Sequence, residues 1–241
     1  MQITMRPMTA EEVWNFMLSN HSLYHKLLKH YHASYTDFIP LVDDFNQMFD
    51  KETLTDQDIE HYKNIFVNKV YNVKKLQQLY NIFEADVKPK FEQAVNKYLV
   101  PLLPSWNAVL PKKLEIQCSY GRGSNYWRKS DDTALMLFRM SRYPDDATKF
   151  LGIMFHEFVH MLIEKPIIQK YNVPQDLKER IVDLICYECI KRPVQPRYKN
   201  SFANAYITPE TIRTDLPGAV QKMMTDYTIL QQKQNSMVQK Q

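Results

Sequence analysis

Length, composition and charge confine the chain to globular classes without an evident nucleic-acid or membrane partner. The 241 residues are 44% apolar and 24% charged, with a net charge of +4, so the chain is long enough to bury a substantial core. It has no block of about five like charges and no run of about 18 apolar residues, which predicts no nucleic-acid partner and no membrane partner.

The amino-terminal residues carry no sign of a targeting segment. Glu11, Glu12 and Asn15 interrupt the apolar residues near the start of the chain, so the continuous apolar stretch of a signal peptide is missing. This predicts a cytoplasmic protein, with secretion by another route left open. The cysteines are too few for a disulfide framework and are expected to be small core side chains in a reducing compartment. They are Cys118, Cys186 and Cys189.

The amino-terminal part of the chain favours helices. Thr9 followed by Glu12 is a capping-box pattern, which predicts a helix start. Between Asp56 and Leu99, apolar residues recur at steps of three and four, the spacing of an amphipathic helix. Pro89 is expected to interrupt these helices, because proline lacks the backbone N–H that an inner helical turn needs.

A proline-rich segment, residues 101–111, is the best candidate for a boundary. It contains three prolines, which are expected to end the preceding helices. We therefore expect a mostly helical region at residues 1–105 and a second region at residues 106–241, either as two units or as one integrated domain.

Two strands are expected at the start of the second region. Lys113 to Tyr120 alternates apolar and polar residues, and Thr133 to Met140 is a short apolar run; both patterns are typical of strands. The segment between them, Gly121 to Trp127, contains two of the four glycines in the chain. One interpretation of it is a hairpin turn whose aromatic residues pack on the sheet.

A helix without a polar face follows the strands. Asp145 or Asp146 can cap its start, and Pro166 is expected to lie beyond its end. Residues 150–163 are apolar on nearly every side, which predicts a helix buried in the centre of the domain.

The most informative motif lies within this helix. His156-Glu157-Phe158-Val159-His160 is a His-Glu-x-x-His run. Residues four apart share one helical face, so both imidazoles can bind one cation, and zinc is the usual one. Glu157 lies about 100° round the helix from His156, where it can hold a water molecule and accept its proton.

A second helix is expected at Pro174 to Lys191, and it supplies candidate carboxylates. Glu179 and Asp183 are four residues apart and share a face. Catalytic zinc takes three protein ligands and keeps one position open, and Glu179 would complete that set. Asp183 would accept the remaining ring N–H of a ligand histidine and so fix its orientation.

The pattern H-E-x-x-H, about twenty residues and E-x-x-x-D resembles the gluzincin metallopeptidases, the thermolysin-like and aminopeptidase-like branch of the zincins. The resemblance covers roughly residues 114–190. It implies an α+β fold in which a zincin-like catalytic region, with a small mixed sheet, an active-site helix and a glutamate helix, follows the helical amino-terminal region. It also implies one Zn²⁺ ion on His156, His160 and Glu179, with Glu157 as general base and Asp183 as their support.

The resemblance implies two further features. Gluzincins carry an edge strand upstream of the motif helix that pairs with the substrate backbone, which makes Asn125, Tyr126 and Trp127 candidates for the substrate-binding rim. They also use a tyrosine or histidine downstream of the motif to stabilise the tetrahedral intermediate. No histidine follows His160, so the candidates are Tyr171, Tyr198, Tyr206 and Arg197. The two we favour are Tyr171 and Tyr206.

These residues predict a zinc-dependent peptidase that hydrolyses a peptide or protein substrate. Two alternatives stay open: a catalytically inactive zincin scaffold that binds a peptide or protein partner, and a hydrolase of small amides. Zinc content together with the activity of a Glu157→Gln variant separates the first alternative from a peptidase.

Overall fold

A small mixed sheet forms the centre of the protein. The computed structural model describes residues 1–31, 42–119, 124–139, 147–193 and 201–238. Within these residues four strands form one sheet, in the order β1-β2-β4-β3. The strands are β1 Gln2–Pro7, β2 Lys113–Ser119, β3 Ser124–Arg128 and β4 Thr133–Arg139.

The pairing of the strands leaves β3 at an edge. β1 and β4 run parallel to β2 on its two sides, and β3 pairs antiparallel with β4, with Tyr126 opposite Met136. The strands predicted near residues 113–120 and 133–140 are confirmed. Alternation places Leu114 and Ile116 in the core, both fully buried, as expected for a sheet that is covered on one face.

Helices make up most of the remaining described residues. The α-helices are α1 Ala10–Ser19, α2 His21–Tyr31, α3 Asp43–Asn46, α4 Asp56–Ile65, α5 Val73–Ile82, α6 Lys88–Ala94, α7 Leu103–Trp106, α8 Ala147–Ile163, α9 Gln175–Ile190, α10 Pro209–Thr214 and α11 Leu216–Val238. Wider π turns are η3 Phe66–Val70, η4 Phe83–Val87, η5 Val95–Leu99 and η7 Glu164–Gln169, and tighter 3₁₀ turns are η2 Gln47–Asp50, η6 Val100–Leu102 and η9 Phe202–Ala205.

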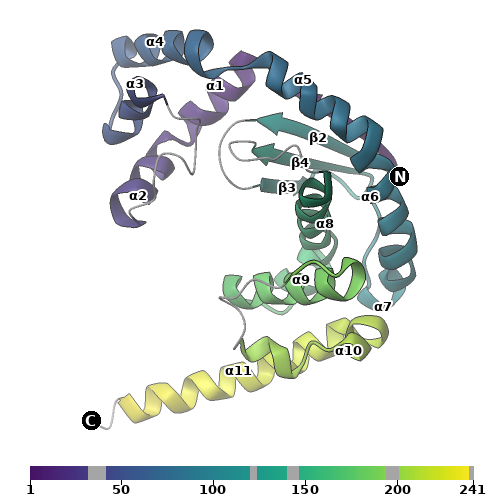
Figure 1. The fold of residues 1–241 in the computed structure, drawn as a ribbon. Coiled ribbons are helices and arrows are strands. Elements are labelled where there is room, and N and C mark those ends of the chain that lie inside the picture. Colours follow the sequence, from purple (N-terminus) through teal and green to yellow (C-terminus); the bar gives the residue numbers. More distant parts are fainter. Residues whose placement is uncertain (32–41, 120–123, 140–146, 194–200, 239–241) are drawn as a thin grey trace.

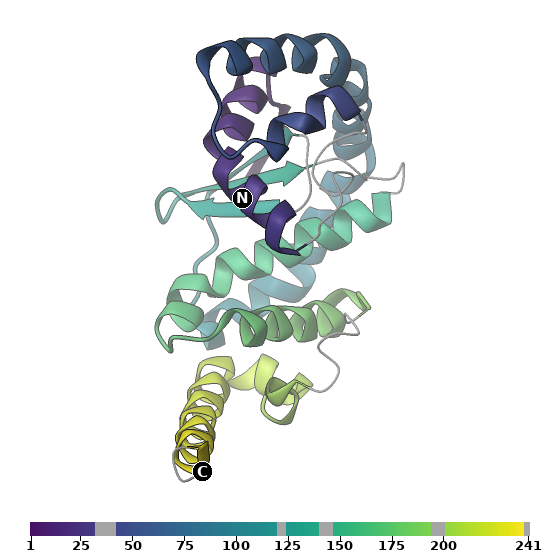
Figure 2. The same cartoon turned by 90° about the vertical axis from the view of Figure 1, so that its left-hand side faces the viewer.

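The elements stack in layers. Figure 1 shows the sheet within an arc formed by α5 and α6, with α8 beside β3, α9 beyond α8, and α10 and α11 beyond α9. The view in Figure 2 gives the same order from sheet to α11. The fold is therefore α+β, and α8 lies between the sheet and α9.

Aromatic packing fixes α8 in the core. Phe158 meets Phe91 of α6 edge-on, with ring centroids 5.2 Å apart. Phe150 contacts Phe138 of β4 at 5.2 Å and Phe83 of η4 at 6.2 Å. Edge-to-face pairs of this kind stabilise a core beyond the area that they bury. The prediction of a buried central helix is confirmed.

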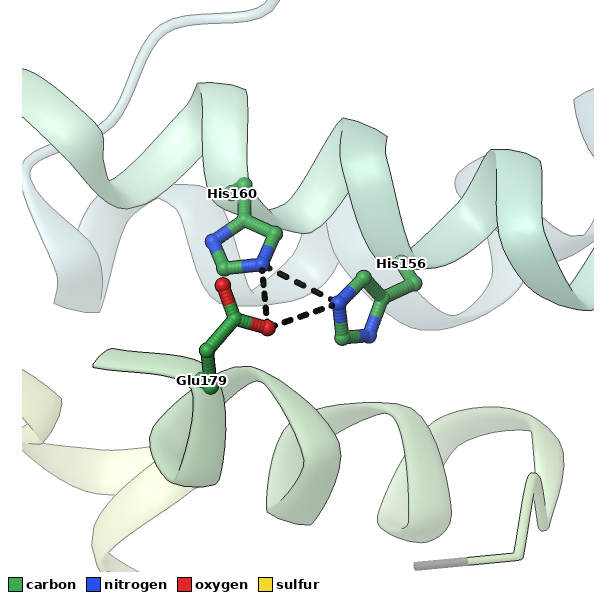
Figure 3. A group of neighbouring side chains, drawn as sticks. All are labelled: His156, His160 and Glu179. Carbon is green, nitrogen blue, oxygen red and sulfur yellow. Dashed lines mark hydrogen bonds and ion pairs between the residues drawn. The ribbon is translucent and has the colours of Figure 1, made fainter. Parts of the chain in front are cut away.

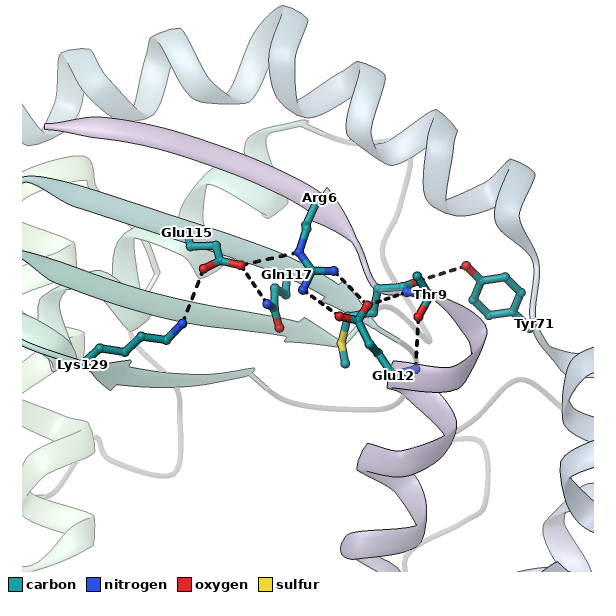
Figure 4. A network of polar contacts seen from close by, with 8 residues as sticks. Arg6, Thr9, Glu12, Tyr71, Glu115, Gln117 and Lys129 are labelled. Carbon is teal, nitrogen blue, oxygen red and sulfur yellow. Dashed lines mark hydrogen bonds and ion pairs between the residues drawn. The ribbon is translucent and has the colours of Figure 1, made fainter. Parts of the chain in front are cut away.

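The amino-terminal region is mostly helical, as expected, but it also supplies a strand that the sequence analysis missed. β1 joins the sheet, and α1 follows it through the predicted capping box of Thr9 and Glu12. Arg6 on β1 donates two hydrogen bonds of 2.8 Å to Glu12 and lies 3.5 Å from Glu115 on β2. Figure 4 shows this network, in which Tyr71 also donates to the carbonyl between β1 and α1. These contacts hold α1 against the end of the sheet.

The helical run from α5 to α7 does not stop at Pro89, where we expected an interruption. Instead α5 widens into the π turn η4, and Pro89 follows directly in α6 without a break in the helical backbone. Pro101 falls likewise in the 3₁₀ turn η6. The run ends at Asn107, whose φ of 54° places it in the left-handed conformation that often terminates helices.

One buried apolar core includes residues from both regions, such as Trp14 of α1 and Phe155 of α8. In the described part of the chain, no helix combines the length and the apolar character that crossing a bilayer requires. The proposed caps Asp145 and Asp146 lie outside the described residues, and the described helix α8 begins at Ala147. It ends at Ile163, before Pro166, as predicted, but Pro166 lies in the π turn η7 that continues α8 and not in a loop.

Candidate metal centre and active-site cleft

Two neighbouring helices bring the predicted ligands together. His156 and His160 lie on successive turns of α8 and face α9. Helix α9 begins after Pro174 and carries Glu179 in its second turn. Figure 3 shows both imidazoles and the Glu179 carboxylate pointing toward one another across the helix interface. Both histidines are buried and Glu179 is partly buried.

The three donor atoms form a nearly regular triangle. The Nε2 atoms of His156 and His160 are 3.0 Å apart, and each lies 3.4 Å from Oε2 of Glu179. Gln175 donates to the other oxygen of Glu179 at 2.7 Å. This bond holds the carboxylate so that Oε2 faces the two imidazoles.

The triangle fits a tetrahedral zinc ion. Ligand atoms about 2.0–2.1 Å from zinc in a tetrahedral site are about 3.3–3.4 Å from one another. The observed edges of 3.0, 3.4 and 3.4 Å differ from this by a few tenths of an ångström at most. Two imidazoles and one carboxylate are also the ligand set that catalytic zinc sites use while keeping a fourth position open.

Asp183 faces one of the predicted ligands. Its Oδ1 is 3.5 Å from Nδ1 of His156, and the side chain is 2% exposed. That distance is long for a hydrogen bond, but the carboxylate faces the ring nitrogen that keeps its proton when Nε2 binds a metal. The arrangement therefore favours the tautomer of His156 that a metal requires.

Electrostatics also suit the site to a cation. Burial lowers the pKa of His156, against an opposing hydrogen bond with Glu179 and with support from the nearby His160. Burial opposes ionisation of Glu179, but the contacts of its carboxylate with His156 and His160 outweigh burial and hold the pKa of the carboxyl well below its usual range. Neutral imidazoles and an ionised carboxylate are the forms that bind a metal.

A cleft of about 1050 Å³ opens directly onto the candidate metal centre. Its lining includes Glu157, His160 and Glu179, together with Tyr126 and Trp127 of the edge strand β3. The predicted general base and two of the predicted metal ligands thus line the same open space. Trp127 is 42% exposed at its rim.

Tyr126 links the edge strand to the metal centre. Its ring stacks on His160, with centroids 5.6 Å apart and an angle of 9° between the planes. Its hydroxyl donates to Glu164 at 2.8 Å. Burial, followed by the effect of Glu164, raises the pKa of Tyr126 well above its ordinary value, so this hydroxyl keeps its proton.

The remaining predicted site residues are Tyr171, Tyr206 and Asn125. Tyr171 lies in the turn between η7 and α9, beneath the ammonium of Lys170, and Tyr206 donates to Asp226 of α11 at 2.9 Å. Neither tyrosine belongs to the described lining of the cleft. Asn125 lies on β3, and its side chain is outside the described part of the structure. The two other candidates for stabilising the intermediate, Tyr198 and Arg197, lie outside the residues that the structure describes.

Sequence reasoning missed most of the described cleft lining, and three of the missed residues contact predicted site residues. Glu164 is four residues after His160 and therefore shares its helical face, a signal that could have been used. Gln175 is likewise four residues before Glu179. Lys178, which also lines the cleft, precedes Glu179 directly, and no spacing rule singles it out.

The cysteines behave as predicted. All three are buried and free of disulfides, and burial raises the pKa of Cys189 to about 12. A thiol with so high a pKa has little reactive thiolate at neutral pH.

Comparisons of the chain with protein-family models, with curated proteins and with solved structures found no match. Any functional conclusion therefore depends on the geometry and chemistry of the side chains.

Proposed function

We propose that this protein is a zinc-dependent peptidase of the gluzincin type, with one Zn²⁺ ion bound by His156, His160 and Glu179. The observation that carries the proposal is the donor triangle, with edges of 3.0 to 3.4 Å, on the wall of a cleft that Glu157 also lines. When bound, zinc supplies a Lewis acid that polarises a carbonyl group and lowers the pKa of water toward neutrality.

The side chains of the cleft have distinct tasks in this proposal. Glu157 accepts a proton from the attacking water and delivers it to the leaving amine, as a general base and then a general acid. Asp183 and Gln175 orient His156 and Glu179 respectively. These roles need no movement of the helices, because the groups already face one another.

The edge strand supports a peptide as the substrate. β3 pairs with β4 on one side, and no described strand pairs with its other side. Such an edge can pair with an extended peptide backbone. Tyr126 and Trp127, two of the proposed rim residues, line the same cleft as Glu157, so a peptide that paired with this edge would lie beside the proposed general base.

A Glu157→Gln variant tests the proposal. Zinc-loaded wild-type protein should cleave members of a peptide library with free and blocked termini. Glu157→Gln should keep one zinc per chain and lose about 10²- to 10⁴-fold in kcat, the usual contribution of a general base. Glu188→Gln serves as the matched control, because Glu188 lies on α9 outside the cleft and pairs with Arg213.

Three outcomes contradict the proposal. Wild-type protein that binds zinc but cleaves no peptide would indicate a binding scaffold. Cleavage of small amides alone would indicate the other alternative. Unchanged turnover in Glu157→Gln would remove the assigned general base.

A further inference from the structure

A second polar cluster lines the cleft next to the metal centre. It consists of Tyr126 on β3, Glu164 at the start of η7 and Lys178 on α9, and we name it the Lys178 cluster. Glu164 accepts a hydrogen bond of 2.8 Å from Tyr126. The ammonium of Lys178 lies 3.4 Å from both the Glu164 carboxylate and the Tyr126 hydroxyl.

The ammonium of Lys178 is poorly satisfied for its degree of burial. Its side chain is only 15% exposed, and an ammonium carries three N–H donors. Its two described hydrogen bonds, at 3.4 Å, are longer than the 2.7–2.9 Å of good charge-assisted hydrogen bonds, and its other described contact is with the Tyr126 ring, whose centroid is 6.0 Å away. A largely buried charge with unused donors favours a further acceptor, and the cleft is the place from which one can arrive.

Glu164 holds this ammonium without using up its donors. The short bond of the carboxylate goes to Tyr126, whose ring is in turn fixed against His160. Glu164 therefore keeps Lys178 on the cleft wall, and Tyr126 connects Glu164 to His160 of the proposed metal centre.

The charges of the lining become positive in sum only with the proposed metal. The cleft is lined by four carboxylates, Glu157 and the proposed ligand Glu179 included, and by three cations, so one bound Zn²⁺ would change the balance from −1 to +1. One of the cations, Arg128, donates both terminal nitrogens to backbone carbonyls of Val109 and Asp131. The buried Nε of Arg128 has no described acceptor, but its two terminal nitrogens are held by the backbone, whereas Lys178 has no backbone acceptor among its described contacts and Lys165 is exposed.

We infer that Lys178 determines substrate specificity by binding a carboxylate of the peptide, either its α-carboxylate or the side chain of Asp or Glu. This inference rests on the proposed peptidase function and names the class of peptide that the cleft selects. The new bond would be a charge-assisted hydrogen bond in a partly desolvated site, a contact that commonly changes affinity by about 10- to 100-fold.

Paired peptides test the inference. One set differs only in a free or an amidated carboxyl terminus, and the other only in Glu or Gln at each position near the cleaved bond. Wild-type protein should prefer the acidic member of at least one pair by about tenfold or more in kcat/KM. The set that shows the preference tells which carboxylate is bound.

Variants of the lysines locate the preference. Lys178→Met should reduce the ratio between acidic and neutral peptides to about one, and Lys178→Arg should retain most of it. Lys165→Met removes the same charge from the exposed part of the cleft and should leave the ratio within about twofold of wild type. Zinc content and circular dichroism show that each variant is folded and loaded.

Binding separates this inference from the proposed function. Affinities of the same peptides for Glu157→Gln protein, followed by the fluorescence of Trp127 and the other tryptophans, need no turnover. A tenfold preference for the acidic peptide that Lys178→Met abolishes supports the inference even if no peptide is cleaved. Equal affinities for acidic and neutral peptides, or a preference that survives Lys178→Met, would overturn it.

Discussion

Replacement of Glu179, the proposed carboxylate ligand, should remove most of the stabilisation that zinc gives to the folded protein. The donor atoms are already within a few tenths of an ångström of tetrahedral spacing, so little of the binding energy is spent on rearrangement. In the proposed function zinc binds the folded chain alone, because the unfolded chain contains no preformed site. At a free zinc concentration 100 times Kd, this linkage stabilises the fold by about 2.7 kcal/mol, which corresponds to a rise in Tm of roughly 5–11 °C for a chain of this size.

Glu179→Gln keeps the shape of the side chain but removes its charge. Loss of a mere supporting residue costs about 10- to 100-fold in metal affinity, so loss of the anionic ligand should cost at least 100-fold. At the same zinc concentration the stabilisation falls to about 0.4 kcal/mol, and the rise in Tm to roughly 1–2 °C. Calorimetric melting with zinc and with a chelator, together with metal analysis, measures both quantities.

Glu188→Gln is again the matched control, because Glu188 is a partly buried carboxylate on the same helix with Arg213 as its partner. Its Tm with chelator can differ from wild type, but the rise on adding zinc should be the same. An equal rise in Glu179→Gln would refute the assignment of Glu179 as a ligand. No rise in wild-type protein at saturating zinc would refute the metal centre itself.

Two further predictions concern the framework around the site. Hydrogen bonds from Arg6 lower the pKa of Glu12 to about 2 from 4.5, so the stabilisation is complete above pH 4.5 and lost as the pH falls toward 2. Because Glu12 is 38% exposed, we expect Glu12→Gln to lower the free energy of unfolding by about 1 kcal/mol at pH 7 and by almost nothing near pH 2. Urea unfolding measures both values, and an equal loss at the two pH values would contradict the prediction. Trp106 is buried and donates to the carbonyl of Ile212 at 2.7 Å, so Trp106→Phe should cost about 1–3 kcal/mol in the same assay, whereas Trp127→Phe at an exposed position should change stability by less than about 0.5 kcal/mol.

The sequence alone sufficed for features that depend on local periodicity. Four-residue spacing on a helix is set by backbone hydrogen bonds within one segment, so the shared face of His156 and His160 could be read directly. The alternation of apolar and polar residues predicted the strand β2, and apolar residues on all sides predicted that α8 is a buried helix. Both predictions depend only on the spacing of residues within one segment.

Features that join distant segments were decided only by the tertiary structure. β1 lies more than a hundred residues from β2 in the sequence. Its pattern is short, and the sequence analysis did not recognise it as a strand in a region where helices were predicted. The Lys178 cluster takes one residue from each of three elements, and nothing in the spacing of Tyr126, Glu164 and Lys178 links them. Such groupings follow from how α8, α9 and the sheet pack, which depends on the sum of many weak apolar contacts and not on the pattern of any one segment.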